Sequence, residues 1–401
     1  MSDRMPAQAE ALRSLLHASH HLPADQLGSM VADHARMLGA TTAVVYLSDY
    51  EQHHLMPVLG EGVPDRTPQP IDASIAGEAF RTVTIARSPL HDGQARLWLP
   101  LLDGSERAGV VELVYPHEPT AADVEHARPF TSLVAELTVT RDAYSDVFAR
   151  LRRSRPMALA AEIQWDLLPP LTFSSERIVI TGALEPSYEI GGDTFDYAVN
   201  GPIAELMVLD AVGHGLPAAL LASAAVGAYR NGRREGLGLP EVSALVNGVI
   251  AEQFPASRFA TAVLAQLDLD SGRLTWVNAG HPAPLVIRDH TLLPAHPCPS
   301  SLPLGLQHRP AHECSVQLEP GDRVVFYTDG IVEARSPDGK FFGEERLADF
   351  VVRAEAAGDP PPETLRRLMR SVLDHQAGRL QDDASIVVVE WRTGREDQLV
   401  L

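Results

Sequence analysis

Four aspartates in the second half of the chain stand at the start or the end of an expected strand, and three of them lie in glycine-bearing motifs. The four are Asp193 in EIGGDTFDY, Asp210 in LDAVGHG, Asp329 in FYTDG and Asp382 in QDDAS. A single aspartate at a strand end is usually a turn or capping residue. Four of them together indicate a shared metal site, because carboxylate oxygens are the ligands that Mg²⁺ and Mn²⁺ prefer.

The spacing of the first two aspartates predicts that they lie on one face of a hairpin. Two runs that alternate as strands, DTFDYAV and AELMVLDA, are separated by the turn signal Asn-Gly-Pro. Because Pro202 has no N–H, we expect a four-residue loop over 200–203, which sets Asp193 opposite Asp210. A two-residue turn leaves them diagonal, and in either case the carboxylates lie within about 5–8 Å. Such a pair repels unless a cation lies between its members.

The same region resembles the metal-dependent type-2C (PPM) serine/threonine phosphatases, in particular their bacterial SpoIIE/RsbU-like branch. The stretches that carry the resemblance are EIGGDTFDY, LDAVGHGLPAALL, VNAGHPAPLV, DRVVFYTDGIVEA, FGEERL and QDDASIVVVE, in the family's order. The resemblance implies an α-β-β-α sandwich of two antiparallel sheets flanked by helices. It also implies hydrolysis of phosphoserine and phosphothreonine by water activated between two divalent cations, about 3.5–4 Å apart.

The resemblance implies a role for each acidic residue as well. Asp210 would bridge two ions, either Mn²⁺ or Mg²⁺, and Asp193 would hold the second ion together with the backbone carbonyl of Ala211. Asp329 and Asp382 would complete the coordination of the first ion. No protein nucleophile is then required, which agrees with the absence of a phosphatase cysteine motif.

The sequence departs from the pattern of many eukaryotic members in two places. Those members place a histidine, thought to act as an acid, directly after the bridging Asp and its Gly, where this chain has Val212. His214, two residues later, is either the general acid or a structural turn residue. They also place an arginine near the first acidic residue, and ALEPSYEI contains none. Asp196 and Asp383 are each open to two interpretations, as a metal ligand or as a group that supports one.

Two other functions compete with a phosphatase. Gly-Gly-Asp also resembles the GGDEF signature of diguanylate cyclases, but Thr194 takes the place of the metal-binding glutamate of that signature. The cyclase hypothesis also leaves the three later aspartates unexplained, so it is the weakest. The second alternative is a phosphatase-like domain with weak or no catalysis that acts as a sensor or scaffold, and the loss of any one of the four aspartates would have favoured it.

Residues 1–120 predict a separate α/β sensory module. Two helical runs precede a strand over 41–49, a short helix over 71–82 and a hairpin over 95–115. LGATTAVVYL, PIDASIAGEAFRT and LWLPLLDGSERAGVVEL resemble a GAF domain. GAF domains bind small ligands or mediate dimers, and the sequence names no ligand, so a purely structural or dimerising domain stays open.

Residues 121–170 predict a helical linker. Apolar residues recur at helical spacing, and breaks at Pro129 and Pro156 predict two helices. One stripe is open to two interpretations, a homodimer seam or a core face. Its members are Phe130, Leu133, Leu137, Tyr144, Phe148 and Leu151. We expect the linker to carry a signal from the first domain to the phosphatase.

Residues 171–394 predict the phosphatase domain, and the whole chain is therefore of the α+β class. Strands are expected over 177–184, 193–199, 204–211, 261–269, 273–280, 283–288, 322–329 and 384–391. Helices are expected over 216–233, 240–254 and 361–377. Many of these strands are apolar on both faces, which is typical of packed sheets covered by helices.

Composition limits the partners and the compartment. The 401 residues include 53 Asp and Glu against 33 Lys and Arg, a net charge of −20, which argues against nucleic acid and anionic membranes. The apolar run over 216–228 is too short to span a bilayer, and the first residues do not form a signal peptide. Cys298 and Cys314 lack metal-type spacing and cannot build a disulfide framework, so a reducing cytoplasm is expected. The resemblance implies a phosphorylated anti-sigma-factor antagonist as the substrate.

Overall fold

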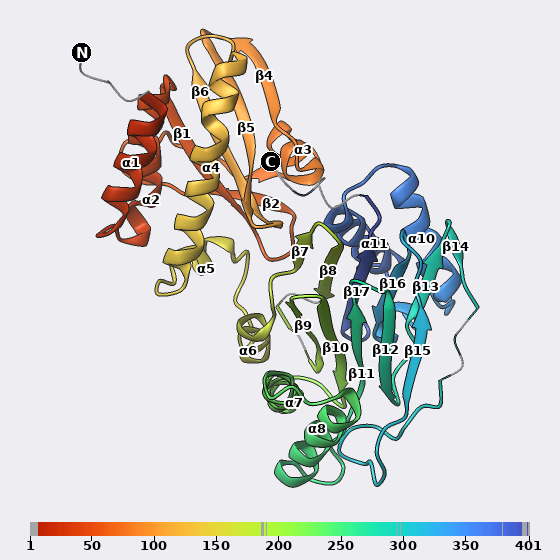
Figure 1. Ribbon diagram of the computed structural model, residues 1–401. Coiled ribbons are helices and arrows are strands. Elements are labelled where there is room, and N and C mark those ends of the chain that lie inside the picture. The colour runs from red at the N-terminus through yellow and green to blue at the C-terminus, as the bar shows by residue number, and fades with distance from the viewer. Residues whose placement is uncertain are drawn as a thin grey trace. The chain divides into compact units, whose positions relative to one another are not determined.

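The computed structural model describes residues 7–185, 188–189, 191–294, 296, 298–378, 380–394 and 399. Ile190 of the EIGGDTFDY motif lies outside these residues. The chain divides between Arg155 and Pro156 into two compact units (Figure 1). The predicted domain bounds of 1–120, 121–170 and 171–394 stay predictions, and each unit is described by itself.

The first unit is built on one six-stranded antiparallel sheet with the strand order β3-β2-β1-β6-β5-β4. Its strands are β1 (Thr42–Ser48), β2 (His54–Pro57), β3 (Gln69–Pro70), β4 (Ala86–His91), β5 (Gln94–Asp103) and β6 (Glu106–Tyr115). Its helices are α1 (Ala7–Ser19), α2 (Leu27–Ala35), α3 (Ile75–Thr82), α4 (Ala121–Asp142) and α5 (Val147–Arg152). Side chains of α1, α2, α4 and α5 pack on one face of the sheet, and α3 packs on the other. This arrangement agrees with the predicted α/β module, while its identity as a GAF domain stays a prediction.

Helix α4 continues through Pro129, so the break predicted there is wrong. Proline removes one helical hydrogen bond, but Phe130 and Val134 on the same stretch are fully buried in the core of the first unit and hold the helix in place. Leu137 and Phe148 are buried in the same core, whereas the Tyr144 side chain is 66% exposed. Most of the apolar stripe is therefore a core face of this unit.

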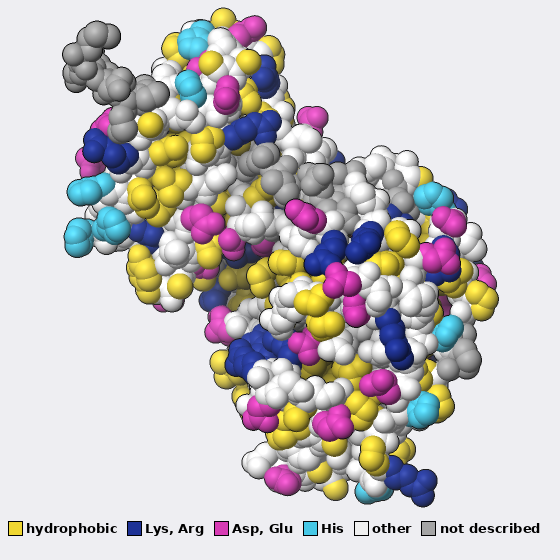
Figure 2. Space-filling view, viewed as in Figure 1, with side chains coloured by type: hydrophobic (Ala, Val, Ile, Leu, Met, Phe, Trp, Pro, Cys, Tyr) yellow, Lys and Arg dark blue, Asp and Glu magenta, His cyan; other side chains and the backbone are white. Residues whose placement is uncertain are grey.

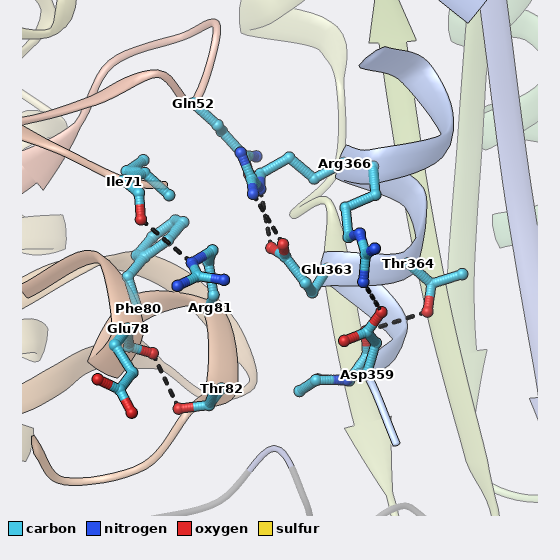
Figure 3. Close-up of polar contacts among 12 residues, drawn as sticks. Gln52, Ile71, Glu78, Phe80, Arg81, Thr82, Asp359, Glu363, Thr364 and Arg366 are labelled. Atoms are coloured by element: carbon cyan, nitrogen blue, oxygen red, sulfur yellow. Dashed lines mark hydrogen bonds and ion pairs between the residues drawn. The ribbon is translucent and has the colours of Figure 1, made fainter. Parts of the chain in front are cut away.

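Helix α3 is held at both ends by short hydrogen bonds. Ser74 caps it by accepting the N–H of Gly77 at 2.9 Å. Near its other end, Arg81 Nε donates to the carbonyl of Ile71 at 3.1 Å, and the Thr82 hydroxyl donates to the carbonyl of Glu78 at 2.8 Å (Figure 3). These bonds stabilise the two ends of α3, while its apolar side chains pack on the sheet.

The second unit contains two antiparallel sheets, with the orders β15-β12-β11-β10-β9 and β14-β13-β16-β17-β8-β7. The strands of the first sheet are β9 (Asp193–Asn200), β10 (Ile203–Ala211), β11 (Ala260–Asp268), β12 (Arg273–Ala279) and β15 (Glu313–Gln317). Those of the second are β7 (Thr172–Ser175), β8 (Ile178–Glu185), β13 (Leu285–Arg288), β14 (Thr291–Leu292), β16 (Arg323–Tyr327) and β17 (Ala384–Trp391). The helices are α6 (Leu159–Leu167), α7 (Leu216–Arg234), α8 (Leu239–Gln253), α9 (Asp329–Val332), α10 (Glu344–Ala356) and α11 (Pro361–His375).

Three apolar layers hold the second unit together. The middle layer lies between the sheets and joins residues such as Phe195 and Leu206 to Phe326 and Val387. An outer layer packs α7 and α8 on the β9–β15 sheet, and the other packs α10 and α11 on the second sheet (Figure 1). The predicted α-β-β-α sandwich is confirmed.

Helix α11 carries a buried ion pair in its first turn. Arg366 Nε and Nη2 donate to the carboxylate of Glu363 at 2.8 and 2.7 Å (Figure 3), and both side chains are at most 5% exposed. The pair joins residues three positions apart on one helix face. It stiffens the start of α11 over the outer face of the second sheet.

The two cysteines form a disulfide, contrary to the expectation of two reduced thiols. Cys314 lies on β15, and the preceding segment returns so that Cys298 pairs with it across a sequence separation of 16 residues. Two cysteines suffice for one such link, which residue spacing alone did not predict. The cytoplasmic location stays a prediction.

The surface carries charges of both signs. On the face shown in Figure 2, acidic and basic side chains are interspersed and the acidic ones do not gather in one patch. Within the described part of the chain, no helix is long and apolar enough to cross a membrane. The apolar run over 216–228 lies in α7, where it packs against the neighbouring sheet.

Candidate metal centre

Asp193 and Asp210 lie directly opposite each other in the ladder between β9 and β10. This register is the predicted one, but the connecting loop is shorter than predicted, so the expectation that a two-residue loop leaves Asp193 and Asp210 diagonal is wrong. It contains only Gly201 and Pro202, because one further pair, Asn200 with Ile203, extends the ladder. Gly201 adopts φ +60°, which a glycine tolerates without steric cost.

The two glycines before Asp193 leave room for other atoms, and Gly192 is required because the atom that approaches it belongs to the backbone. A Cβ on Gly191 would lie 2.2 Å from Asp383 Oδ2, and a Cβ on Gly192 would lie 2.1 Å from the carbonyl oxygen of Ala211. The N–H of Gly192 donates to Asp383 Oδ2 at 2.8 Å. Asp383 therefore anchors the loop before Asp193 to the start of β17, which supports the interpretation that it assists a ligand.

Asp193 is bound to the second sheet through Thr328. The Thr328 hydroxyl donates to Asp193 Oδ2 at 2.5 Å and accepts the backbone N–H of Ser385 at 2.9 Å. Sequence reasoning missed Thr328, although its place directly before Asp329 at a strand end was a usable signal. Gly330 is required in the same turn, because a Cβ there would lie 1.8 Å from the carbonyl oxygen of Asp383.

The acidic residues at this end of the two sheets interact electrostatically. Burial raises the pKa of Asp193 well above its usual value, and the negative charge of Asp210 raises it further. Burial, followed by the charges of Asp329, Asp382 and Asp383, raises the pKa of Asp210 to about 7. Burial and Asp382 also raise the pKa of Asp329. The charges of the predicted aspartates therefore act on one another at this end of the sheets.

An oxygen-binding divalent cation fits this set of residues. Of the four aspartates, Asp193 is buried, Asp210 and Asp329 are partly buried and Asp382 is exposed. Carboxylates that repel one another are stabilised by a cation between them, and an all-oxygen donor set suits Mg²⁺ or Mn²⁺. Among the residues that the structure describes, no three His, Cys, Asp or Glu side chains already stand close enough together to hold an ion.

The segment after Asp210 turns sharply toward α7. Ala211 N donates to the carbonyl of Gly192 at 3.2 Å, and Arg258 Nη1 donates to the carbonyl of Val212 at 3.1 Å. Gly213 and Gly215 have φ +99° and +67°, conformations that favour glycine. His214 is exposed between them, and within the described residues its ring makes no hydrogen bond.

Asp196 lies on the opposite face of β9 from Asp193, because side chains three residues apart in a strand point to opposite sides. Its carboxylate pairs with Arg230 at 2.6 Å and with Arg233 at 2.9 Å, both on α7. Arg230 also donates to the carbonyl of Leu167 at 2.5 Å. Asp196 is therefore an anchor for α7 and not a ligand of the centre.

His281 shapes the loop that follows β12. Its backbone exchanges two hydrogen bonds with the Asn278 side chain, at 2.9 and 2.8 Å. Its Nδ1 lies 2.7 Å from the hydroxyl of Thr261, the residue that pairs with Asp210 in the ladder. Burial lowers the pKa of His281 to about 4, so the ring is neutral at physiological pH. This agrees with the structural role predicted for it.

Residues 204–392 match the sequence profile described as Stage II sporulation protein E (SpoIIE). The second unit carries a SpoIIE family domain. Phosphoserine phosphatase RsbU of Bacillus subtilis (strain 168) is 26% identical over 234 residues, 58% of this chain and 68% of RsbU. Phosphoserine phosphatase RsbP of the same organism is 24% identical over 254 residues, 60% of this chain and 59% of RsbP.

The SpoIIE domain also has similarity to solved structures. The RsbU and RsbW domains of a Mycobacterium tuberculosis protein are 27% identical, with a TM-score of 0.47, and the match covers 56% of this chain and 62% of that one. The family match and the two relatives class the chain with the PPM-type serine/threonine phosphatases. The predicted family and enzyme class are confirmed.

Proposed function

We propose that the chain hydrolyses phosphoserine and phosphothreonine in a partner protein, using two Mn²⁺ or Mg²⁺ ions held by the aspartates of the SpoIIE domain. The observation that carries this proposal is the register of β9 and β10, which sets Asp193 opposite Asp210 at the end of the sheet. Burial, followed by the charges of Asp329, Asp382 and Asp383, raises the pKa of Asp210, which supports the proposal that these carboxylates share one centre.

In the proposed site each residue has one task. Asp193, Asp210 and the carbonyl of Ala211 would hold one ion, and Asp210, Asp329 and Asp382 would hold the other. Ions bound in this way lower the pKa of bound water and neutralise charge on the phosphoryl group.

His214 is proposed to give a proton to the departing serine or threonine oxygen, because it is exposed beside this centre. Its position in a loop between two glycines leaves its ring accessible to a bound substrate. A turn residue with no part in the reaction would show the same exposure, so the role of His214 is decided by mutation. Loss of turnover in His214→Ala with unchanged Mn²⁺ affinity would support it.

We further propose that the substrate is a phosphorylated anti-sigma-factor antagonist and that the first unit regulates its dephosphorylation. The support is the match to RsbU and RsbP, both named phosphoserine phosphatases, over slightly more than half of this chain. The two-unit division at Arg155 supports a separate regulatory part. Homodimerisation through the first unit and the linker helices belongs to the same proposal.

A second candidate is a SpoIIE domain with weak or no catalysis that senses or binds its partner. One observation favours it, namely that no three potential ligands stand close together in the described residues. The cyclase hypothesis has no such support, because Gly191 and Gly192 are explained by the approach of Asp383 and Ala211.

Hydrolysis of p-nitrophenyl phosphate by the full chain tests the proposal, with Mn²⁺, with Mg²⁺ and with EDTA. We expect metal-dependent turnover that falls at least about 100-fold in Asp210→Asn, since the ions supply several kcal/mol of transition-state stabilisation. Asp338→Asn is the matched control, because Asp338 is 61% exposed and pairs with Lys340. Mn²⁺ binding by wild type without any turnover would contradict the proposal and favour the second candidate.

A further inference from the structure

We infer that Thr328 is a positioning residue, which orients the Asp193 carboxylate so that one of its oxygens stays directed at the metal. The inference rests on the proposed function, because it assumes that Asp193 is a ligand. It assigns a task to a residue that neither metal chemistry nor the spacing of the aspartates requires.

The hydrogen bonds of Thr328 determine where its single proton goes. The hydroxyl oxygen accepts the N–H of Ser385 at 2.9 Å, which occupies one of its lone pairs. Two acceptors are then within reach of the O–H group, Asp193 Oδ2 at 2.5 Å and the carbonyl of Ser385 at 3.4 Å. The much shorter distance favours Asp193. Asp193 Oδ2 therefore accepts the bond from Thr328, and this bond fixes the direction of Oδ1, the oxygen that we infer binds the ion.

The hydrogen bond from Thr328 to Asp193 is difficult to replace, because both side chains are buried. Thr328 is 0% and Asp193 is 2% exposed, so water does not replace a lost partner at either group. A carboxylate held by a single short bond from a buried donor keeps one orientation. Groups that orient a metal ligand in this way typically change metal affinity or activity about 10- to 100-fold when they are removed.

The bond also joins the two sheets at the centre. Asp193 belongs to β9, whereas Thr328 follows β16 and immediately precedes Asp329. Ser385, the donor to Thr328, lies on β17 two residues after Asp383. Thr328 thus links a proposed ligand of the second ion to the segment that carries a proposed ligand of the first. Any shift between the sheets would turn the Asp193 carboxylate, so Thr328 holds the two halves of the centre in register.

The test compares three threonine variants of the full chain by calorimetric titration with Mn²⁺. Thr328→Val keeps the shape but removes the donor, and we expect the Mn²⁺ dissociation constant to rise about 10- to 100-fold. Thr328→Ser keeps the hydroxyl and is expected to stay within about threefold of wild type. Thr181→Val is the matched control, because Thr181 is 1% exposed in the second sheet and, in the described residues, its hydroxyl has no hydrogen-bond partner.

Melting in EDTA and in Mn²⁺ separates a positioning role from a structural one. A positioning role predicts that Mn²⁺ raises the melting temperature of Thr328→Val less than that of wild type, Thr328→Ser or Thr181→Val. If Thr328→Val does not fold in EDTA, Thr328→Cys replaces it, and its weak S–H donor should still raise the Mn²⁺ dissociation constant.

The outcomes are distinguishable. Equal Mn²⁺ affinity in wild type and Thr328→Val would overturn the role of Thr328 and leave the proposed phosphatase site standing. No Mn²⁺ binding by wild type would overturn both proposals. Loss of affinity in Thr328→Ser comparable to that in Thr328→Val would show that packing, and not the hydroxyl, is what matters.

Discussion

Gly192 illustrates how one missing side chain permits the centre to form. Its Cα lies close to the carbonyl of Ala211, the group proposed to bind the second ion, while its N–H donates to Asp383. The same position thus faces one strand of its own sheet and the first residues of β17. A side chain there would push against backbone, which cannot rotate away.

We predict that Gly192→Ala destabilises the second unit by about 1–3 kcal/mol, as overpacking at a site without free space typically does. Urea denaturation checks the change in the free energy of unfolding, and Mn²⁺ titration should show weakened binding as well. Gly248→Ala is the control, because no atom lies within 4 Å of a Cβ added at that position on α8. It should stabilise by about 0.5–1 kcal/mol, and equal effects of the two changes would contradict the close-approach argument.

At the scale of elements, the anchoring of α7 to β9 depends on one buried carboxylate. Asp196 is 1% exposed and bonds two arginines, of which Arg233 is 9% and Arg230 is 26% exposed. Helix α7 begins directly after the loop that follows Asp210, so its position determines where that loop leaves the sheet. The Asp196 pairs therefore fix the helix on the face opposite to the metal centre.

We predict that Asp196→Ala destabilises the second unit by about 3–5 kcal/mol, because removing one partner leaves buried charge uncompensated. The control is Asp349→Ala, which breaks an ion pair with Arg353. Because the Asp349 side chain is 52% exposed and that of Arg353 is 78% exposed, the variant should lose at most about 0.5 kcal/mol of unfolding free energy. Denaturant midpoints of both variants provide the measurement. A loss below about 1 kcal/mol in Asp196→Ala would show that α7 is anchored by apolar packing alone.

The elements differ in how well the sequence predicts them. Strands β8, β9, β10, β11, β12 and β17 all lie within about one residue of their predicted bounds, because each is a largely buried, strand-forming run bounded by turn residues. Helix α10 and strand β15 were not predicted. Strand β15 alternates exposed and buried residues over only five positions, so its placement depends on pairing with β12, which is distant in sequence.

In the candidate metal centre, too, contacts between residues close in sequence were predicted and contacts between residues far apart were not. The opposition of Asp193 and Asp210 follows from a single hairpin, so the sequence predicts it. The bonds from Thr328 and Asp383 cross between sheets and connect residues 135 and 191 positions apart, and no local pattern encodes such contacts. The continuity of α4 was not predicted, because packing in the core holds the helix together at Pro129. The disulfide was not predicted either, because it depends on the segment before β15 folding back to bring Cys298 beside Cys314.

At the scale of the whole molecule, each unit has apolar cores of its own. The first has clusters on both faces of its sheet, and the second has three layers of its own residues. Burial of this kind lets a unit fold independently. Regulation of the second unit by the first then requires an energetic coupling between two parts that are each stable alone. Deleting the first unit tests for this coupling.

We predict that residues 156–394 expressed alone fold, bind Mn²⁺ with the affinity of the full chain and hydrolyse p-nitrophenyl phosphate. Their rate on a phosphorylated protein substrate should differ at least about threefold from that of the full chain, which corresponds to a modest coupling free energy. Circular dichroism and a steady-state phosphate-release assay supply the measurements. Identical rates and identical responses to effectors would contradict regulation by the first unit.

Strand β17 is the last strand of the second unit in chain order, yet it lies inside its sheet, between β16 and β8. Asp382, Asp383 and Ser385 stand at its start. During synthesis on the ribosome, a chain that has emerged only as far as α11 therefore lacks both an inner strand and part of the metal centre. We therefore expect such a chain to lack phosphatase activity, because the second sheet and the proposed metal site are completed only when β17 has been made.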